Sequence, residues 1–378
     1  MPGLIAHEWI ELHGGAEKVL DMMAATFPDA DITCLWSDAP ERYTEHRVVE
    51  SGLARTPLRG RKALSLPFMS RHWRNYDTTD YDWVLVSSHA FAHHIGSRRS
   101  LRERPTYVYT HTPARYLWNP ELDDRGASLP ARLGSRALRK LDRRHAGGAQ
   151  YAANSAFVRD RIRAAWDVDA TVLHPPVDVE RLQRHPDWRL QLTEAERAFV
   201  DDLPNAYLLG ASRFVPYKAL DKVIAFGERT DLPVVLAGAG PDETRLRSIA
   251  AASRTAVTFV DRPRDALLYS LLQRATAYVF PAVEDFGILP VEAVALGTPV
   301  IVNSVGGASE SLQVTAGGAW HNFDDHATAN ESLHRALQAN MDQARIASWK
   351  FSNEMFQSRL AAWVSPSEKR LSASAPNH

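Results

Sequence analysis

Two glutamates, Glu284 and Glu292, are the strongest candidates for binding a ligand. They lie eight positions apart in the segment Phe280–Asn303, FPAVEDFGILPVEAVALGTPVIVN. Carboxylates can accept paired hydrogen bonds from vicinal hydroxyl groups, which sugars and ribose supply. Pro290 suits the first turn of a helix and Gly297 its end, so Glu292 is expected in that first turn. The alternative is that Glu292 serves only the helix, since acidic residues favour helix starts in general.

The stretch between the two glutamates is suited to an anion. It follows a predicted strand and leads into a predicted helix, whose first amide groups have no acceptor within the helix. A phosphate could therefore bind the backbone amides of Phe286, Gly287 and Ile288.

Two cations follow the first predicted strand in the second half of the chain. That strand covers Tyr207–Ala211, Arg213 follows it, and Lys218 is expected to open the next helix, Lys218–Arg229. Both side chains could then reach one site, where an arginine fork and a lysine point charge would stabilise a departing diphosphate. The alternative, a solvated surface pair, is the better interpretation of these two residues in isolation.

Small residues and a histidine follow strands in the first half. Gly14 and Gly15 lie between a predicted strand, Gly3–His7, and a predicted helix, where they would let a diphosphate or sugar approach the backbone. A plain turn is the alternative. His111 follows the predicted strand Thr106–Thr110, so it is expected at the carboxyl edge of the sheet, where ligands of such sheets bind. For His111 the alternative is a structural histidine of the core.

A second group of histidines follows the predicted strand Trp83–Ser87. His89, His93 and His94 could contact an acceptor. A metal site is disfavoured because no acidic pair accompanies these histidines nearby in the sequence. We therefore expect no bound metal.

A glycine-containing turn, Leu236–Pro241, is similar to the start of a dinucleotide-binding fingerprint. Asp261 also lies at a suitable distance downstream. However, Glu243 occupies the place of the third small residue, and the turn follows the second strand of its half rather than the first. A nicotinamide enzyme is kept as an alternative, which a cofactor-fluorescence titration would expose.

Short apolar runs alternate with helical patterns along the chain, which predicts parallel sheets covered by helices. The other expected strands are Asp31–Leu35, Gln150–Ala153, Val234–Ala237, Val257–Val260, Ala277–Phe280 and Pro299–Asn303. The other expected helices include Ala16–Ala25, Ala131–His145 and Asp265–Arg274. Prolines in His174–Asp178 interrupt the pattern, and the charge-dense stretch Arg181–Asp202 is interpreted as a linker between domains. The sequence thus predicts an α/β protein with two doubly wound domains in series, facing a central cleft.

Together these motifs resemble a known family. Glu284–Gly287 with Glu292 is similar to the glutamate–seven residues–glutamate motif of retaining glycosyltransferases of family 4, which have the two-domain GT-B fold with Rossmann-like domains. The segment His111–Trp118, HTPARYLW, is similar to bacterial mannosyltransferases of O-antigen and exopolysaccharide assembly. The resemblance covers nearly the whole chain and also includes Gly14, Gly15, Ala16, Glu17, Ser212, Arg213 and Lys218.

The resemblance implies a role for each candidate residue. The catalytic residues would be His111, Glu284, Arg213 and Lys218, with His111 beside the donor sugar and the two cations at the diphosphate. The donor-binding residues would be Gly14, Gly15, Arg213, Lys218, Asp261, Arg262, Glu284, Phe286, Gly287, Ile288 and Glu292, of which Asp261 and Arg262 would hold the nucleobase. The acceptor-binding residues would be His89 and Arg115. No cofactor is implied, because the nucleotide sugar is a co-substrate.

The resemblance also implies how the chain is divided. Residues 1–178 would form the acceptor-side domain and residues 203–349 the domain that binds the nucleotide-sugar donor. A helix at about 350–364 is expected to pack back on the first domain, because its apolar residues recur near helical spacing. These residues are Phe356, Leu360, Ala361 and Trp363. Residues 365–378, rich in Ser, Pro and Lys, are expected to be a disordered tail.

Bulk composition limits the remaining classes. The 378 residues suit two domains, and a net charge of −1 gives no support for nucleic-acid binding. The single cysteine, Cys34, excludes a disulfide framework and predicts a buried thiol in a reducing cytoplasm. Neither a signal peptide nor a transmembrane run is expected. Two basic stretches, Pro57–Arg74 and Arg132–Arg144, suit either contact with an anionic membrane or an ordinary solvated face.

We therefore expect a retaining, metal-independent hexosyltransferase in the cytoplasm, peripheral on the inner face of the plasma membrane where its basic stretches touch lipid. The expected donor is GDP-mannose. The expected acceptor is a lipid-linked or other saccharide in surface polysaccharide or glycolipid biosynthesis. The alternatives are a nucleotide-sugar epimerase on the same fold, which needs no acceptor, and a non-catalytic protein that binds sugar nucleotides.

Overall fold

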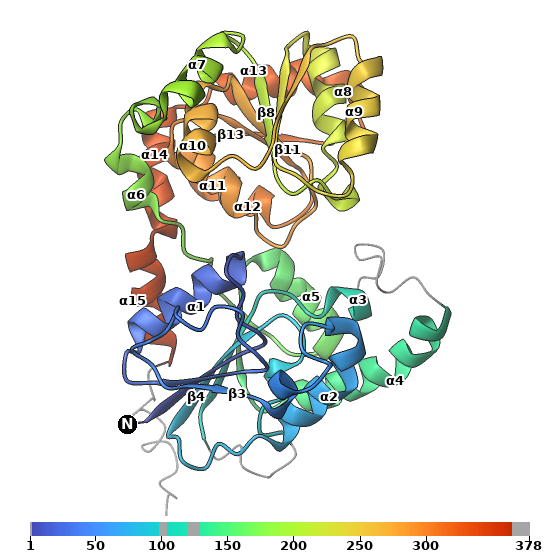
Figure 1. Ribbon diagram of the computed structural model, residues 1–378, viewed down its shortest axis with the longest axis vertical. Helices are drawn as coiled ribbons and strands as arrows, with labels where there is room; N and C mark the ends of the chain where they lie inside the picture. Colours follow the sequence, from blue (N-terminus) through green and yellow to red (C-terminus); the bar gives the residue numbers. More distant parts are fainter. Residues whose placement is uncertain (1, 98–103, 119–128, 365–378) are drawn as a thin grey trace, which may run out of the picture. The chain divides into compact units, whose positions relative to one another are not determined.

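The computed structural model describes residues 2–97, 104–118 and 129–364 (Figure 1). The chain forms two compact units, each built on a parallel sheet. Unit 1 takes in the chain up to Asn154, the stretch Val158–His174 and the part from Glu354 onward. Unit 2 takes in Ser155–Phe157 and Pro175–Asn353.

Unit 1 contains a seven-stranded sheet in the order β3-β2-β1-β4-β5-β6-β7. Its strands are β1 (Gly3–His7), β2 (Asp31–Cys34), β3 (Val48–Glu50), β4 (Trp83–Ser88), β5 (Thr106–Thr110), β6 (Gln150–Ala153) and β7 (Thr171–Val172). The strand order reverses between β1 and β4, and ligands of open parallel sheets bind beyond the carboxyl ends at such a point. His7 and Ser87 are partners in the register of these two strands.

Helices cover both faces of this sheet, because successive strand side chains point to opposite sides. They are α1 (Gly15–Thr26), α2 (Lys62–Asn75), α3 (Arg115–Trp118), α4 (Leu129–Ala146), α5 (Ala156–Trp166) and α15 (Asn353–Val364), with 3-10 turns η1 (Gly52–Arg55) and η2 (Ala92–His94). Side chains of α2, α4 and α5 pack on one face, and those of α1 and α15 on the other. In α15, Phe356 and Trp363 meet Tyr109 and Tyr107 edge-on, with ring centroids 5.9 and 5.3 Å apart.

Unit 2 contains a six-stranded sheet in the order β10-β9-β8-β11-β12-β13. Its strands are β8 (Leu208–Ala211), β9 (Val234–Ala237), β10 (Val257–Val260), β11 (Ala277–Phe280), β12 (Val300–Asn303) and β13 (Gly318–His321). The order reverses between β8 and β11, which gives this sheet its own switch point.

Helices α8 and α9 lie on one face of the second sheet and α10 and α11 on the other (Figure 1). The helices are α6 (Val179–Arg184), α7 (Glu194–Asp202), α8 (Asp221–Thr230), α9 (Glu243–Ala252), α10 (Asp265–Arg274), α11 (Ile288–Ala295), α12 (Ala308–Thr315), α13 (Ala329–Leu337) and α14 (Met341–Ser348). The 3-10 turns are η5 (Trp188–Gln191), η6 (Pro216–Lys218), η7 (His326–Thr328) and η8 (Trp349–Phe351).

The interpretation of Arg181–Asp202 as a linker is wrong. The stretch forms α6, η5 and α7, and its apolar residues Trp188, Leu192 and Val200 are buried in the core of unit 2. Thr193 and Glu196 form a capping box at the start of α7. The high charge density of the stretch reflects amphipathic helices whose charged faces are solvated, rather than an unpacked connection.

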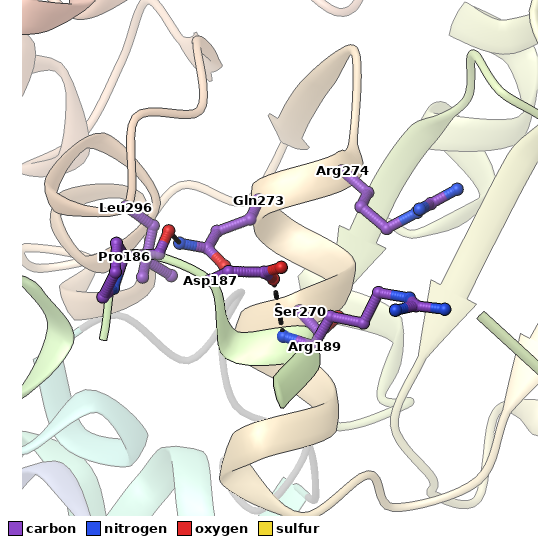
Figure 2. A pocket seen from close by; sticks show the side chains of 7 residues that line it. All are labelled: Pro186, Asp187, Arg189, Ser270, Gln273, Arg274 and Leu296. Atoms are coloured by element: carbon purple, nitrogen blue, oxygen red, sulfur yellow. Dashed lines mark hydrogen bonds between the residues drawn. The ribbon is translucent and has the colours of Figure 1, made fainter. Parts of the chain in front are cut away.

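A cavity of about 330 Å³ lies where this stretch meets α10 (Figure 2). Its lining includes Asp187 and Arg189 from the stretch and Gln273 from α10. The Gln273 side chain donates to the carbonyl of Pro186 at 3.2 Å and accepts from the Trp188 amide at 2.8 Å. These bonds fasten the stretch to unit 2.

The α/β fold class with two doubly wound, Rossmann-like sheets is confirmed. Cys34 is buried, as predicted, and burial raises the pKa of its thiol to about 12. Strands β3, β7 and β13 were missed because they are short, half-buried or begin with glycine. No helix among the described residues combines the length and apolar character needed to cross a bilayer. The predicted tail, 365–378, lies outside the described residues.

Candidate functional site

Lys218 and Glu284 form an ion pair at the carboxyl edge of the second sheet. Lys218 follows β8 and Glu284 follows β11, which is the strand paired with β8. Their side chains are 13 % and 15 % exposed. Lys218 lies in η6 and α8 begins only at Asp221, so the expectation that Lys218 opens the helix is wrong. The structure nevertheless brings a predicted cation and a predicted carboxylate together at the switch point.

The loop that carries Glu284 is held by two glycines that the sequence analysis missed. The Gly307 amide donates to the carbonyl of Glu284 at 2.7 Å. A Cβ on Gly307 would lie 1.9 Å from the Asp285 carbonyl oxygen, and Gly306 has a φ of +109°. The backbones therefore meet too closely for any side chain. The pair of glycines directly after β12 was the signal that could have revealed this contact.

The segment between the glutamates forms a helix start, as predicted. Gly287 is the N-cap residue, with a φ of 86°, and Ile288 begins α11. The Phe286 side chain is buried, with its ring centroid 5.6 Å from that of Phe351, so the backbone of Phe286 is the part suited to a ligand.

Glu292 is the fifth residue of α11, so its expected place in the first turn is wrong. Its interaction with the amide groups at the helix start is correspondingly weaker, and that start has no acidic residue in its first turn. Glu292 is 7 % exposed. A glutamate buried one turn into a helix is not explained by helix capping, and its role in binding a ligand stays a prediction.

A second feature of this edge is a cavity of about 340 Å³ whose wall is mostly apolar. Arg213 and Arg262, which come from different loops, both line it. Arg213 also donates to the hydroxyl of Tyr217 at 2.8 Å. Asp261 is 70 % exposed and lies 3.6 Å from Arg262 across an ion pair. An apolar cavity with two guanidinium groups suits a planar base joined to an anion.

The glycine turn after β9 has a structural explanation. A Cβ on Gly238 would lie 1.8 Å from the carbonyl oxygen of Ser212, and one on Gly240 would lie 2.2 Å from that of Phe214. The amide of Phe214 donates to the carbonyl of Ala239 at 2.8 Å. Because close packing of two backbone segments requires these glycines, they give no specific support to a dinucleotide fingerprint.

In unit 1, three side chains form a chain of hydrogen bonds at the carboxyl edge. The hydroxyl of Ser87 lies 2.9 Å from Nδ1 of His7 and 2.8 Å from Nε2 of His111. The His111 backbone is fixed on both sides, because its amide donates to the Ser88 carbonyl and its carbonyl accepts from Asn154, each at 2.9 Å. Burial lowers the pKa of His7 to about 3 and that of His111 to about 4. Both rings are therefore neutral near pH 7.

Gly14 and Gly15 lie at the start of α1, where Gly14 is the N-cap residue and Gly15 begins the helix. A Cβ on Gly14 would lie 1.9 Å from Oε2 of Glu17. Glu17 is 3 % exposed, and burial raises the pKa of its carboxyl. The small size of Gly14 thus makes room for a buried carboxylate, and the predicted contact of these glycines with the donor stays a prediction.

The structure separates the three histidines that follow β4. His89 belongs with His7 and His111, since its ring centroid lies 5.6 Å from the first and 6.0 Å from the second. His93 and His94 are instead fully buried in η2. The three histidines therefore do not form one cluster, and the acceptor-binding role of His89 stays a prediction. Arg115, the other predicted acceptor residue, begins α3 and is half-buried.

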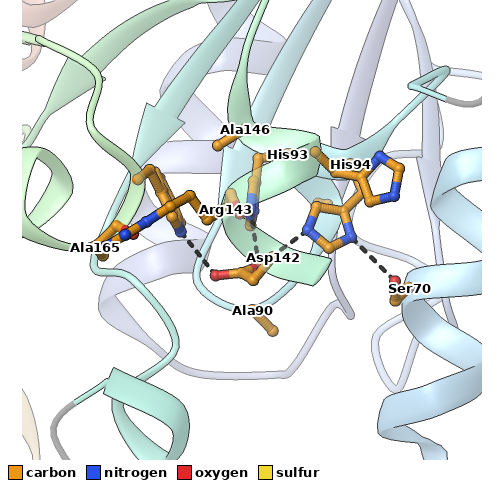
Figure 3. Close-up of polar contacts among 12 residues, drawn as sticks. Ser70, Ala90, His93, His94, Asp142, Arg143, Ala146 and Ala165 are labelled. Carbon is orange, nitrogen blue, oxygen red and sulfur yellow. Dashed lines mark hydrogen bonds and ion pairs between the residues drawn. The ribbon is translucent and has the colours of Figure 1, made fainter. Parts of the chain in front are cut away.

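His93 and His94 meet a buried aspartate from α4 that the sequence analysis missed (Figure 3). Asp142 Oδ1 lies 3.1 and 2.9 Å from Nε2 of His93 and His94. Its Oδ2 accepts from the indole groups of Trp118 and Trp166, each at 2.7 Å. These three residues could hold a metal ion by type and distance. However, hydrogen bonds from His94, Trp118 and Trp166 already engage both carboxylate oxygens, so we interpret the cluster as a buried hydrogen-bond network.

Replacing Asp142 by asparagine should destabilise unit 1 by about 3 kcal/mol. The amide would present two hydrogens to a site where the carboxylate accepts from the indole groups of Trp118 and Trp166, and a broken buried network is costly. Urea unfolding checks this, with Asp160→Asn as the matched control because Asp160 is exposed. A chelator that lowered the melting temperature of the unaltered protein would instead identify the cluster as a metal site.

Comparison with known proteins identifies the class. Residues 13–181 match the family described as Glycosyltransferase Family 4, and residues 194–349 match Glycosyl transferases group 1. Together the two matches cover most of the chain. The protein therefore belongs to the glycosyltransferases, with a family 4 first part and a group 1 second part.

Individual relatives are similar over less of their length. The GDP-mannose-dependent monoacylated alpha-(1-6)-phosphatidylinositol monomannoside mannosyltransferase of Corynebacterium glutamicum is 29 % identical over 178 residues, which are 43 % of this chain and 46 % of that protein. The D-rhamnosyltransferase WbpZ of Pseudomonas aeruginosa is 31 % identical over 192 residues, 48 % of this chain and 46 % of WbpZ. The matched part of this chain thus spans about half the length of these curated relatives.

Among solved structures, HepE of Anabaena in complex with UDP has a TM-score of 0.66. The match covers 96 % of this chain and 99 % of HepE at 17 % identity. At that identity the similarity establishes a shared fold only. The ligand of this protein has to be inferred from its own residues.

Proposed function

We propose that this protein is a retaining hexosyltransferase that takes mannose from GDP-mannose. The observation that carries the proposal is the edge of the second sheet, where the Lys218–Glu284 ion pair accompanies a cavity lined by Arg213 and Arg262. This edge offers positive charge for a diphosphate and an apolar wall for a base. Glu292, buried in α11, supplies a carboxylate for the ribose hydroxyl groups.

The choice of GDP-mannose rests on the relatives. The Corynebacterium protein is named as GDP-mannose-dependent. The resemblance of the segment His111–Trp118 to bacterial mannosyltransferases points to the same sugar. HepE binds UDP, so a uridine nucleotide is the competing donor that an experiment must include.

The chemistry we propose requires no metal ion and no covalent sugar intermediate. Arg213 and Lys218 stabilise the departing diphosphate, and Glu284 keeps the ammonium group of Lys218 in position. An oxygen of the leaving phosphate takes the proton of the acceptor hydroxyl, so the new bond forms on the face that the phosphate leaves. His111 binds a hydroxyl group of the donor sugar.

The acceptor we propose is a lipid-linked or other saccharide, bound by unit 1 through His89 and Arg115. The Corynebacterium relative is named for an acceptor that is a phosphatidylinositol mannoside, which is a glycolipid. A lipid acceptor would bring the protein to the inner face of the plasma membrane. The exposed basic residues of α4, among them Arg136, Lys140 and Arg144, suit an anionic surface.

A thermal-shift panel of GDP-, UDP- and ADP-sugars tests the donor. GDP-mannose should raise the melting temperature most at equal concentration, because stabilisation grows with occupancy. Calorimetry should then show that Glu292→Ala weakens binding by about 1–3 kcal/mol, the usual loss when a buried hydroxyl pair loses its acceptor. Glu331→Ala serves as a control, since Glu331 is an exposed glutamate on α13. Preference for UDP-sugars would reject the donor, and equal affinity of the Glu292 variant would reject its role.

A further inference from the structure

We propose that His7 and Ser87 form a directional hydrogen-bond chain, biased by the Glu17 carboxylate 4.0 Å from His7, that holds His111 with its proton on Nε2, so that Nδ1 is an acceptor for a sugar hydroxyl. The proposal rests on the proposed function, which places His111 beside the donor sugar. The hydrogen bonds join three residues on or just after the neighbouring strands β1, β4 and β5, and Glu17 of α1 lies beside the His7 end. In this chain Ser87 and His7 are positioning residues.

The hydroxyl of Ser87 allows only two arrangements. It lies within hydrogen-bond distance of Nδ1 of His7 and Nε2 of His111, but it has a single hydrogen to donate. If both rings donated to its oxygen, the hydroxyl hydrogen of this buried serine would have no acceptor among its side-chain partners in the described residues. One ring nitrogen therefore accepts from Ser87, and the other donates to it. The protonation of the two neutral rings is consequently coupled: whichever way Ser87 points, it fixes the tautomer of both.

Glu17 decides between these arrangements. Its Oε1 lies 4.0 Å from Nε2 of His7, and both side chains are almost fully buried. A carboxylate at that distance favours an N–H over a lone pair on the facing nitrogen. His7 therefore carries its proton on Nε2 and accepts at Nδ1 from the Ser87 hydroxyl. The Ser87 oxygen is then left to accept from His111, which places the His111 proton on Nε2.

The residues around Glu17 favour this direction of hydrogen-bond donation. The amide of Glu11 donates to Oε1 of Glu17 at 3.2 Å, which favours the charged carboxylate. Gly14 provides the space that the carboxylate occupies. Arg42, the nearby cation, is held by Asp21 through two hydrogen bonds of 2.8 and 2.7 Å. The charge of Arg42 is thus offset by Asp21, and the carboxylate of Glu17 is the negative charge that lies 4.0 Å from Nε2 of His7.

The tautomer has a consequence for the ligand. A neutral histidine with a bare Nδ1 accepts a hydrogen bond from a hydroxyl group but repels an oxyanion. The chain therefore suits a neutral hexose at His111 rather than a uronic acid. It also removes the need for His111 to select a tautomer when the donor binds, which is preorganisation of a binding group.

Nitrogen NMR of protein labelled at histidine tests the chain without reference to activity. The His111 signals, assigned from their loss in His111→Gln, should show a protonated Nε2 and a bare Nδ1 at pH 7.5. Ser87→Ala and Glu17→Gln should each convert this pattern into a mixture of tautomers. Ser88→Ala is the matched control: its hydroxyl lies on the same strand but bonds to Glu8, so the His111 signals should not change. A bare Nε2 in the unaltered protein, or an unchanged pattern in Ser87→Ala, would overturn the proposal.

Steady-state kinetics then test whether the hydrogen-bond chain contributes to sugar transfer. Ser87→Ala should lower kcat roughly tenfold to a hundredfold with little change in the KM for donor, because His111 is misplaced while the nucleotide contacts of unit 2 persist. Ser87→Thr retains the hydroxyl and should recover most of the loss. If His111→Gln itself left transfer unchanged, the role of His111 in the proposed function would fail, whereas the NMR result would still decide the chain.

Discussion

Replacing Lys218 by alanine should lower kcat for sugar transfer by roughly a hundredfold or more while the fold persists. Loss of one group that stabilises developing charge on a leaving group commonly has an effect of that size. The structure adds a second cost, because Glu284 would lose its ion-pair partner and place an unopposed negative charge near the diphosphate. Arg213→Ala should act in the same direction through the loss of its guanidinium fork.

The matched control for this prediction is Lys222→Ala. Lys222 lies four positions further along, and its ammonium group pairs with the exposed Asp324 at 2.7 Å, away from the loop of Glu284. Its loss should change stability by less than about 1 kcal/mol and leave turnover close to normal. Normal turnover in Lys218→Ala, with an intact melting curve, would show that Lys218 does not stabilise the leaving group.

The parts of the fold that could be predicted from the sequence are those that local pattern determines. Strands such as Trp83–Ser88 and Ala277–Phe280 are short apolar runs, as buried parallel strands must be. The stretch with Trp188 and Val200 misled the prediction because amphipathic helices and linkers share a high charge density. The stretch is a set of packed helices rather than a linker only if its apolar residues are buried against a core. Distant parts of the sequence provide that core.

The candidate site was predictable where its residues directly follow strands. Lys218 and Glu284 could be placed at one edge because parallel strands end together, and the structure does bring them into contact. Ser87 could not be identified in this way, since serine at the end of a strand is common. Its importance comes from two histidines, His7 and His111, which lie 80 positions before it and 24 after it.

The Asp142 network illustrates the same limit. A sequence search for a metal or polar cluster looks for acids near His93 and His94, but the partner lies 48 positions away from His94 on another helix. The two indole donors come from two further helices, α3 and α5. Long-range pairing of this kind leaves no local pattern, so the structure was required to find it.

The second large effect we expect is a steep loss of stability in acid. Burial lowers the pKa of His7 and His94 to about 3 and that of His72 and His111 to about 4, against about 6.5 in an unfolded chain. Their stabilisation is fully present above pH 6.5. As pH falls below that value, these histidines are protonated in the unfolded chain but stay neutral in the folded one. Stability is therefore lost progressively toward pH 4.

Each such histidine contributes a slope of about 1.4 kcal/mol per pH unit. Two buried carboxyls, Glu8 and Glu17, act in the opposite direction, because burial raises their pKa and the folded chain retains their protons longer. The four histidines together set an upper limit of about 6 kcal/mol per pH unit and the two carboxyls reduce it, so unit 1 should lose stability as pH falls from about 6.5 to 4.5. Urea unfolding at several pH values, followed by hydrogen exchange of unit 1 peptides, measures this slope.

Single variants can attribute the slope to particular residues. His72→Phe should reduce the slope of stability against pH by about 1.4 kcal/mol per pH unit. The substitution removes one imidazole that takes up a proton in the unfolded chain but not in the folded one. His72 is suited to this test because it lies on α2, outside the hydrogen-bond chain of His111. His13→Gln should leave the slope as it is, since His13 is exposed. An equal slope in His72→Phe and in the unaltered protein would show that His72 does not stay neutral in the folded protein over this range.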